Sequence, residues 1–232
     1  LAGHSLGEYS ALVAAEAMTL VGAVKLVNLR GKLMQSAVPV GEGAMAAILG
    51  LADAEVIELC QKASTLGQGS VDAANYNAQG QVVIAGTTAL VQQVMNEAKE
   101  KSGKAIALPV SVPSHCSLMK PAAEKFAEAL EQVAIELPKI PVIHNVNAEF
   151  AKDLAQLRQA LTAQLYQSVQ WTRSMQYLQD QGIQYVVECG PGMVLSNLAK
   201  RLPNIEKAFA IDSKARMEDA LNAILVAEGK IA

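Results

Sequence analysis

The feature that most constrains the fold is a serine between two glycines at the start of the chain. Residues 3–7 read GHSLG and match the pattern G-x-S-x-G, in which a strand turns sharply into a helix and exposes the serine hydroxyl. We expect both glycines to be required because the strained turn leaves no room for side chains. There the Leu6 N–H and the helix dipole point at an oxyanion formed beside Ser5. The same five residues also fit a turn without catalytic function.

Composition restricts the other possibilities. The net charge is −3 without any basic block, so we expect no nucleic-acid partner. No run approaches the roughly 18 apolar residues of a membrane span, so we expect no membrane partner. Cys60, Cys116 and Cys189 are an odd number without C-x-x-C spacing, which predicts a cytoplasmic protein without disulfides or a metal site. We also expect no cofactor.

Hydrophobic periodicity predicts an α/β protein with one domain inserted into another. In residues 40–111 the order is β-α-β-β-α-β, which is the ferredoxin-like arrangement. Residues 1–39 and 112–232 form the large domain, in which we expect a mainly parallel sheet with flanking helices and the serine elbow. The predicted strands are 44–51, 70–76, 81–85, 105–110, 142–146 and 185–188. Three predicted helices begin at residues 6, 53 and 87, and four others cover 20–36, 119–136, 153–165 and 173–181. One more helix is predicted after the turn at 190–192. Residues 111–117 are predicted to form a loop.

Two further residues could carry chemistry in the predicted helices and loops. Arg30 lies on the apolar ridge of helix 20–36 with Met34 one turn later, and by periodicity alone an arginine that reaches solvent is the favoured interpretation. His115 lies 110 residues after Ser5, in a loop of small residues before a helix, where a histidine is well placed as a general base.

The remaining polar residues of interest receive structural interpretations. Glu8 lies in the first turn of the first helix, where a carboxylate is favourable to the helix dipole, so a capping role is as well supported as a catalytic one and we assign it no chemistry. We expect His4 to pack beside the elbow and His144 to end a strand.

Six segments together resemble one known family. The string GHSLGEYSALVAAEA resembles the active-site motif of the acyl-carrier-protein acyltransferases, an α/β family of enzymes. Five other segments resemble parts of that family in the same order, and the six span nearly the whole chain. The five segments are LVNLRGKLMQ, NYNAQGQVVIAG, SVPSHCSLMKP, ALTAQLYQSVQW and ECGPGMVL.

The resemblance implies a reaction and its partners. Members transfer a malonyl group from malonyl-CoA to the phosphopantetheine thiol of acyl carrier protein, which supplies extender units for fatty acid synthesis. By this resemblance Ser5 is the nucleophile of a ping-pong reaction, with the Leu6 N–H as an oxyanion donor. His115 is the general base. It is oriented by a backbone carbonyl that the match places at Gln164.

The resemblance also implies how the substrate is bound. Arg30 would pair bidentately with the free malonyl carboxylate, a task suited to its planar fork of donors, and Met34 would be a second substrate-binding residue. The alternatives are an acyltransferase of a polyketide pathway, a serine esterase or lipase of similar fold, and a docking domain without activity. An esterase would need an acidic triad member after the elbow, and no aspartate stands out in a suitable motif.

The start of the chain leads to one more expectation. Full-length family members carry an upstream Gly-Gln-Gly turn whose glutamine supplies a second oxyanion donor, whereas this chain begins at Leu1. The Gly-Gln-Gly at residues 67–69 lies between a helix and a strand of the small domain, and we interpret it as a linker. We therefore expect an N-terminally truncated enzyme that, alone, is poorly stable and nearly inactive.

Overall fold

The first helix begins directly after the elbow serine. The computed structural model describes residues 1–110, 112–227 and 229–230 and divides into two units, Leu1–Ser174 and Met175–Ala232. Residue 111, which bounds the predicted small domain and begins the predicted loop 111–117, lies outside the described residues. In the described part, no helix is long and apolar enough to cross a membrane.

The elbow is strained at Ser5 and tightly packed on one side. Ser5 has φ 51° and ψ −112°, a backbone conformation that a non-glycine residue adopts only when its surroundings enforce it. Helix α1 (Leu6–Ala14) follows. A Cβ atom added to Gly3 would lie 2.0 Å from the carbonyl oxygen of Gly7, whereas one added to Gly7 would meet nothing within 4 Å. The steric requirement is therefore confirmed for Gly3, and the same expectation for Gly7 is wrong.

We predict that Gly3→Ala destabilises the protein and that Gly7→Ala does not. The added methyl at residue 3 overlaps the backbone of α1, so the helix must shift, at an expected cost of about 1–3 kcal/mol or more in the free energy of unfolding. At residue 7 alanine enters open space inside a helix, where it is favoured over glycine by up to about 1 kcal/mol. Urea unfolding of both variants measures the difference, and equal stabilities would contradict the steric argument.

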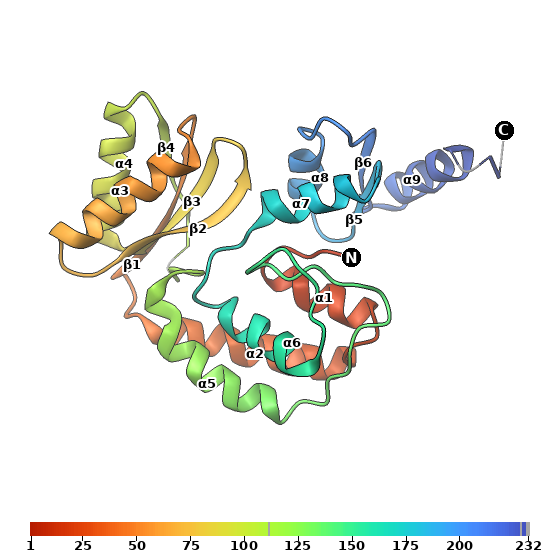
Figure 1. Ribbon diagram of the computed structural model, residues 1–232, viewed down its shortest axis with the longest axis horizontal. Coiled ribbons are helices and arrows are strands. Elements are labelled where there is room, and N and C mark those ends of the chain that lie inside the picture. The colour runs from red at the N-terminus through yellow and green to blue at the C-terminus, as the bar shows by residue number, and fades with distance from the viewer. Residues whose placement is uncertain (111, 228, 231–232) are drawn as a thin grey trace. The chain divides into compact units, whose positions relative to one another are not determined.

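Three helices share the larger apolar core with α1. They are α2 (Leu20–Ala37), α5 (Lys120–Glu131) and α6 (Leu154–Ala163). Figure 1 shows them in a group with α1. Tyr9 of α1 meets Phe126 of α5 edge to face, with 6.3 Å between ring centroids, and both side chains are fully buried. This packing holds the helix that follows the elbow.

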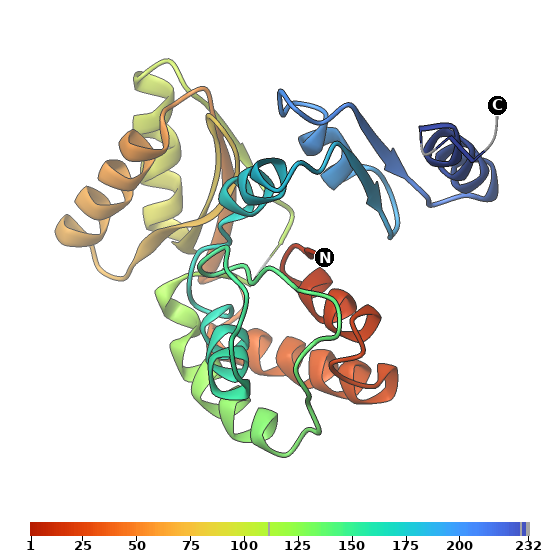
Figure 2. The same cartoon turned by 45° about the vertical axis from the view of Figure 1, so that its right-hand side comes forward.

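The six elements predicted between residues 40 and 111 occur in the predicted order. They are β1 (Gly43–Leu49), α3 (Asp53–Leu66), β2 (Val71–Ala78), β3 (Gln81–Thr87), α4 (Thr88–Glu100) and β4 (Lys104–Ala107). The strands pair in the order β2-β3-β1-β4, and every pairing is antiparallel. Figures 1 and 2 show α3 and α4 side by side against one face of this sheet, and their apolar side chains share a core with it.

This antiparallel sheet lies within the predicted small domain, so the expectation of a mainly parallel sheet in the large domain stays a prediction. The predicted strand 142–146 does not form. A strand needs a continuous ladder of hydrogen-bonded partners, and this segment lacks one among the described residues. In the described part of that segment only Ile143 forms a bridge, parallel to Ala2. The predicted helix 119–136 begins with the 3₁₀ turn Ser117–Met119. It ends five residues early, at Glu131, and the side chain of Arg158 donates to the carbonyl oxygens of Leu130, in the last turn, and of Val133, just beyond it.

The second unit contains a small parallel sheet. Helix α7 (Trp171–Asp180) spans the boundary between the units. After it come β5 (Tyr185–Glu188), α8 (Val194–Ala199), β6 (Lys207–Ala210) and α9 (Lys214–Ala227). Strands β5 and β6 pair in parallel. The Glu188 carboxylate accepts hydrogen bonds from the backbone N–H groups of Leu195 and Ser196, so it caps α8. Our sequence interpretation missed β6 and α9.

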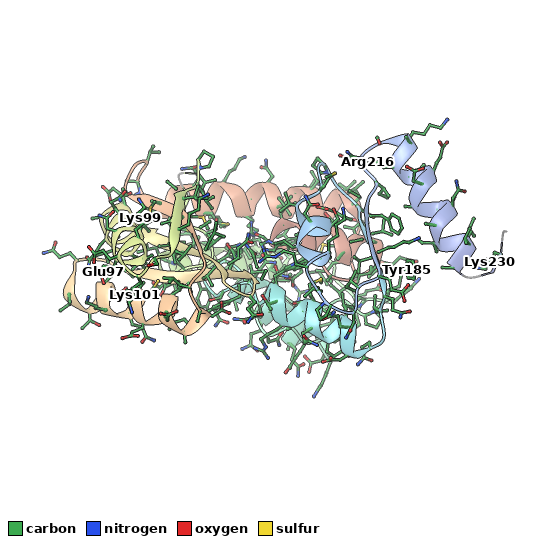
Figure 3. All side chains as sticks on the ribbon, turned by 90° about the horizontal axis from the view of Figure 1, so that it is seen from above. Glu97, Lys99, Lys101, Tyr185, Arg216 and Lys230 are labelled. Atoms are coloured by element: carbon green, nitrogen blue, oxygen red, sulfur yellow. The ribbon has the colours of Figure 1, made fainter. Side chains whose placement is uncertain are left out.

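Charged pairs on the surface add little to this architecture. Lys62 and Glu97 join α3 to α4 at 2.8 Å, and Figure 3 shows Glu97 near Lys99 and Lys101 at the end of α4. In the second unit, Arg216, also labelled in Figure 3, pairs with Asp212 at 2.7 Å. Exposed pairs of this kind contribute only about 0–1 kcal/mol each, so the buried cores carry most of the stability.

Candidate active site

The fold brings Ser5 and His115 into hydrogen-bond contact. Ser5 Oγ lies 2.8 Å from His115 Nε2, and His115 Nδ1 lies 2.6 Å from the backbone oxygen of Gln164. Because a carbonyl oxygen can only accept, Nδ1 carries the imidazole proton and Nε2 is left to accept the proton of Ser5. The Ser5 hydroxyl makes no capping bond to α1. The three residues therefore have the geometry of a nucleophile, a base and an orienting group.

The loop that carries His115 is held at both ends of the histidine. The N–H of His115 donates to the backbone oxygen of Leu165 at 3.0 Å, and the backbone φ of His115 is 63°. Two residues later, Ser117 donates through its N–H and its hydroxyl to Asp72 of β2, at 2.8 and 2.7 Å. These contacts maintain an unfavourable backbone conformation that points the imidazole at Ser5.

The imidazole of His115 is neutral at pH 7. Burial lowers its pKa, the nearby guanidinium of Arg30 lowers it further, and the hydrogen bond to Gln164 acts in the opposite direction, with a result of about 3. Desolvation and a nearby positive charge both disfavour the imidazolium. His115 can therefore act as a proton acceptor without first losing a proton.

Arg30 is buried beside the nucleophile. Its Nη2 donates to Ser5 Oγ at 3.3 Å and to Gln164 Oε1 at 3.1 Å, and its Cζ lies 5.8 Å from the ring centroid of Tyr9. Only 6% of the residue is exposed. Arg30 forms no ion pair among the described residues, and its Nε has no partner there. The interpretation of Arg30 as an arginine that reaches solvent is therefore wrong.

Leu6 and Met34 occupy different surroundings. Leu6 is the first residue of α1, where a backbone N–H has no acceptor within the helix, so this donor is available next to Ser5. Met34 is 4% exposed and packs in the apolar core with Tyr9. It takes no part in the hydrogen bonds that join Ser5, Arg30 and His115, and its role in substrate binding stays a prediction.

Our sequence interpretation missed the group that braces the elbow. Asn145 Oδ1 accepts from the N–H of Ser5 and Asn145 Nδ2 donates to the oxygen of Gly3, both at 2.7 Å. The one available signal was an asparagine inside a predicted strand, where this residue type is rare. Glu8 is fully buried and accepts hydrogen bonds from His144 and Asn145. Its interpretation as a capping residue is therefore wrong.

The other histidines lie close to the elbow. His4 Nε2 contacts Asn77 Oδ1 at 2.8 Å, and the His4 ring lies 5.3 Å from that of Trp171, so His4 packs beside the elbow as predicted. His144 Nδ1 lies 2.7 Å from Glu8 Oε1. Since the segment 142–146 is not a strand, the expectation that His144 ends one is wrong.

A cavity of about 330 Å³ opens next to the base. His115 borders it, and its polar lining includes Asp72 of β2, Ser117 of the 3₁₀ turn and Gln170 from the segment after Gln164. The cavity gives a second molecule room to reach His115. Among the described residues, no group of three or more histidine, cysteine or acidic side chains could hold a metal ion.

Comparison with known proteins shows the family to which the chain belongs. Residues 1–209 match the model of the acyl transferase domain. The malonyl CoA-acyl carrier protein transacylase of Salmonella typhimurium is 47% identical over 222 residues, which are 95% of this chain and 71% of that protein. The corresponding protein of Bacillus subtilis is 44% identical, with 96% of this chain and 70% of that protein covered.

Solved structures are similar along the same length. The crystal structure of FabD from Acinetobacter baumannii has a TM-score of 0.97 and 84% identity, and covers 98% of this chain and 72% of that one. A malonyl-transacylase in complex with its type II PKS acyl-carrier protein has a TM-score of 0.92 and 43% identity. The match covers 96% of this chain and 72% of that one. With its elbow, its buried arginine and these relatives, the chain belongs to the acyl transferase family, among the malonyl CoA-acyl carrier protein transacylases.

Proposed function

We propose that this protein transfers malonyl groups from malonyl-CoA to the phosphopantetheine thiol of acyl carrier protein, and so supplies extender units for fatty acid synthesis. The observation that carries the proposal is the guanidinium of Arg30, which is buried 3.3 Å from the Ser5 hydroxyl and has no ion-pair partner in the described part of the chain. A buried cation without a counter-charge is costly. A substrate with a free carboxylate, placed so that its thioester reaches Ser5, would supply that counter-charge.

In the first half-reaction Ser5 Oγ attacks the thioester carbonyl carbon of malonyl-CoA. His115 Nε2 accepts the serine proton, and the N–H of Leu6 donates to the oxyanion of the tetrahedral intermediate. When the intermediate collapses, the carbon–sulfur bond breaks and coenzyme A leaves with the proton from His115. Ser5 then carries the malonyl group as an ester.

In the second half-reaction the thiol of acyl carrier protein enters by the cavity beside His115. His115 removes the thiol proton, the thiolate attacks the malonyl ester, and Ser5 regains its proton as the new thioester leaves. The bond from His115 Nδ1 to the oxygen of Gln164 keeps the imidazole in the required tautomer throughout.

Substrate binding also tunes the base. The positive charge of Arg30 is one of the causes that lower the pKa of His115. A malonyl carboxylate paired with Arg30 would offset that charge and raise the pKa of His115. The imidazole would thus become a stronger base only after a carboxylated substrate has bound.

We predict that Arg30→Ala weakens malonyl transfer far more than acetyl transfer. Loss of hydrogen bonds to a charged group costs roughly 1.5–3 kcal/mol, which is about a tenfold to hundredfold loss of kcat/KM for malonyl-CoA. Acetyl-CoA lacks the carboxylate, so kcat/KM for acetyl-CoA should fall by only a small factor. Parallel kinetics with the two donors measure the ratio, and equal losses would mean that Arg30 is only structural.

The proposal extends to the domains. Residues 40–111 would be a ferredoxin-like domain, supported by its strand order β2-β3-β1-β4, inserted into a large domain of residues 1–39 and 112–232. Two parallel pairings, Ala2 with Ile143 and β5 with β6, support mainly parallel strands in the large domain. The three free cysteines, two of them buried, are compatible with the cytoplasmic location that we propose.

A serine esterase is the weaker alternative. His115 Nδ1 is held by a main-chain carbonyl in place of a triad carboxylate, as the family resemblance implied. Polyketide synthesis remains the alternative pathway, since one relative is a malonyl-transacylase bound to a type II PKS acyl-carrier protein. An acyl carrier protein thiol should accelerate product formation. Hydrolysis of malonyl-CoA at the same rate without any thiol acceptor would favour the esterase.

A further inference from the structure

The side chain of Gln164 joins three parts of the site. It is fully buried. Its Nε2 donates to the backbone oxygen of Ser5 at 3.0 Å and to Glu8 Oε2 at 2.8 Å, and its Oε1 accepts from Arg30 Nη2 at 3.1 Å. The backbone oxygen of the same residue accepts from His115. One residue therefore contacts the nucleophile's backbone, the base and the buried cation.

Glu8 determines which way the amide of Gln164 faces. The Glu8 carboxylate and the carbonyl of Ser5 can only accept hydrogen bonds, so the amide NH₂ group must face them and the amide oxygen must face Arg30. Glu8 is itself held by His144 Nδ1 at 2.7 Å and by the N–H of Asn145 at 3.0 Å. The opposite amide orientation would place the NH₂ group against a guanidinium, which has no acceptor.

The amide also keeps the two buried charges apart. A carboxylate in direct contact with Arg30 would occupy its donors in a bidentate pair. A neutral amide between Glu8 and Arg30 orients the guanidinium through Nη2 and leaves its positive charge uncompensated at short range. Arg30 thus stays available to an anion that arrives beside Ser5.

We propose that Glu8 and the side chain of Gln164 are positioning residues for recognition of the substrate carboxylate. Glu8 sets the amide orientation, and the amide then sets the plane of the guanidinium beside Ser5. This inference rests on the proposed malonyl transfer and deepens it. The role lies in the side chain of Gln164 and is separate from the backbone carbonyl that orients His115.

The test replaces the amide and keeps the backbone. Gln164→Met and Gln164→Asn retain the carbonyl bond to His115 but cannot link Glu8 to Arg30, and Gln159→Met makes the same change on the exposed face of α6. In the intact protein, acylation of Ser5 is measured with malonyl-CoA and with acetyl-CoA, and melting temperatures identify the folded variants. We expect KM for malonyl-CoA to rise about tenfold in the Gln164 variants. The ratio of malonyl to acetyl transfer should fall in the Gln164 variants, whereas Gln159→Met should stay within about threefold of the wild type with both donors.

Glu8 variants separate positioning from packing. In Glu8→Gln the new NH₂ group can face an unprotonated His144 Nδ1, so its oxygen still accepts from Asn145 and Gln164, and malonyl selectivity should be retained. Glu8→Leu removes the acceptor and should reproduce the effect of Gln164→Met.

The outcomes distinguish the two levels of the proposal. If folded Gln164 or Glu8→Leu variants lose malonyl and acetyl transfer equally, or lose neither, the positioning role is overturned while malonyl transfer stands. If the wild-type protein takes up no malonyl group on Ser5, the proposed function itself fails.

Discussion

Ser5→Ala is expected to abolish the malonyl-enzyme adduct and to lower the rate of malonyl transfer on the order of 10⁴–10⁶-fold, as when a nucleophile is removed from a serine enzyme. The reason is that the covalent ester on Ser5 divides the transfer between two thiols into two steps that use the same base, His115. The methyl group of alanine offers no atom to form that ester.

Mass spectrometry after a short exposure to malonyl-CoA measures the adduct directly. Ser10→Ala is the matched control, because Ser10 lies on the exposed face of α1 only five residues away. The control should carry one malonyl group per chain, as the wild type should. A malonyl adduct that persists at full stoichiometry on Ser5→Ala would place the nucleophile elsewhere.

His115→Ala is expected to slow acylation of Ser5 by about 10²–10⁴-fold, the usual contribution of a general base. The imidazole Nε2 lies 2.8 Å from Ser5 Oγ, and the other described partner of this hydroxyl, Arg30, can only donate. Stopped-flow release of coenzyme A measures the first half-reaction separately from the second. Added imidazole should enter the vacated space and restore part of the rate, whereas a wild-type rate in the variant would remove His115 from the mechanism.

The pH dependence of the wild type checks the same assignment. Burial and Arg30 hold the pKa of His115 at about 3, below the ordinary value of 6.5. A lowered pKa means that the imidazole of the free enzyme stays neutral as the pH falls from 7 to about 5, so kcat/KM for acylation should change little over that range. A rate that drops with a midpoint near the ordinary value would show a base in a more hydrated environment than His115 occupies.

Local sequence sufficed for the elements whose signals lie within a few residues. The turn at Ser5, the helix after it and the six elements from β1 to β4 follow from glycines, capping residues and short-range periodicity. The segment 142–146 is as apolar as a strand, but strand formation depends on a neighbouring ladder, which no local pattern encodes.

Local sequence identified some residues of the site, and tertiary structure determined their contacts. Ser5, Arg30 and His115 could be selected from the sequence because their segments resemble a family, yet their contacts join residues 25 to 159 positions apart. Glu8 shows the limit most clearly. Its position in a first helical turn is compatible with a capping residue, whereas packing against residues 144, 145 and 164 removes it from water and makes it an acceptor at the centre of the site.

The elbow and the family followed from residue types at fixed spacing, because the chemistry of a strained serine turn is local. Tertiary structure alone decided which charges were left without partners. The burial of Arg30 and the neutral amide between it and Glu8 arise where α1, α2 and the end of α6 meet, and hydrogen bonding between distant segments is fixed only when those helices pack.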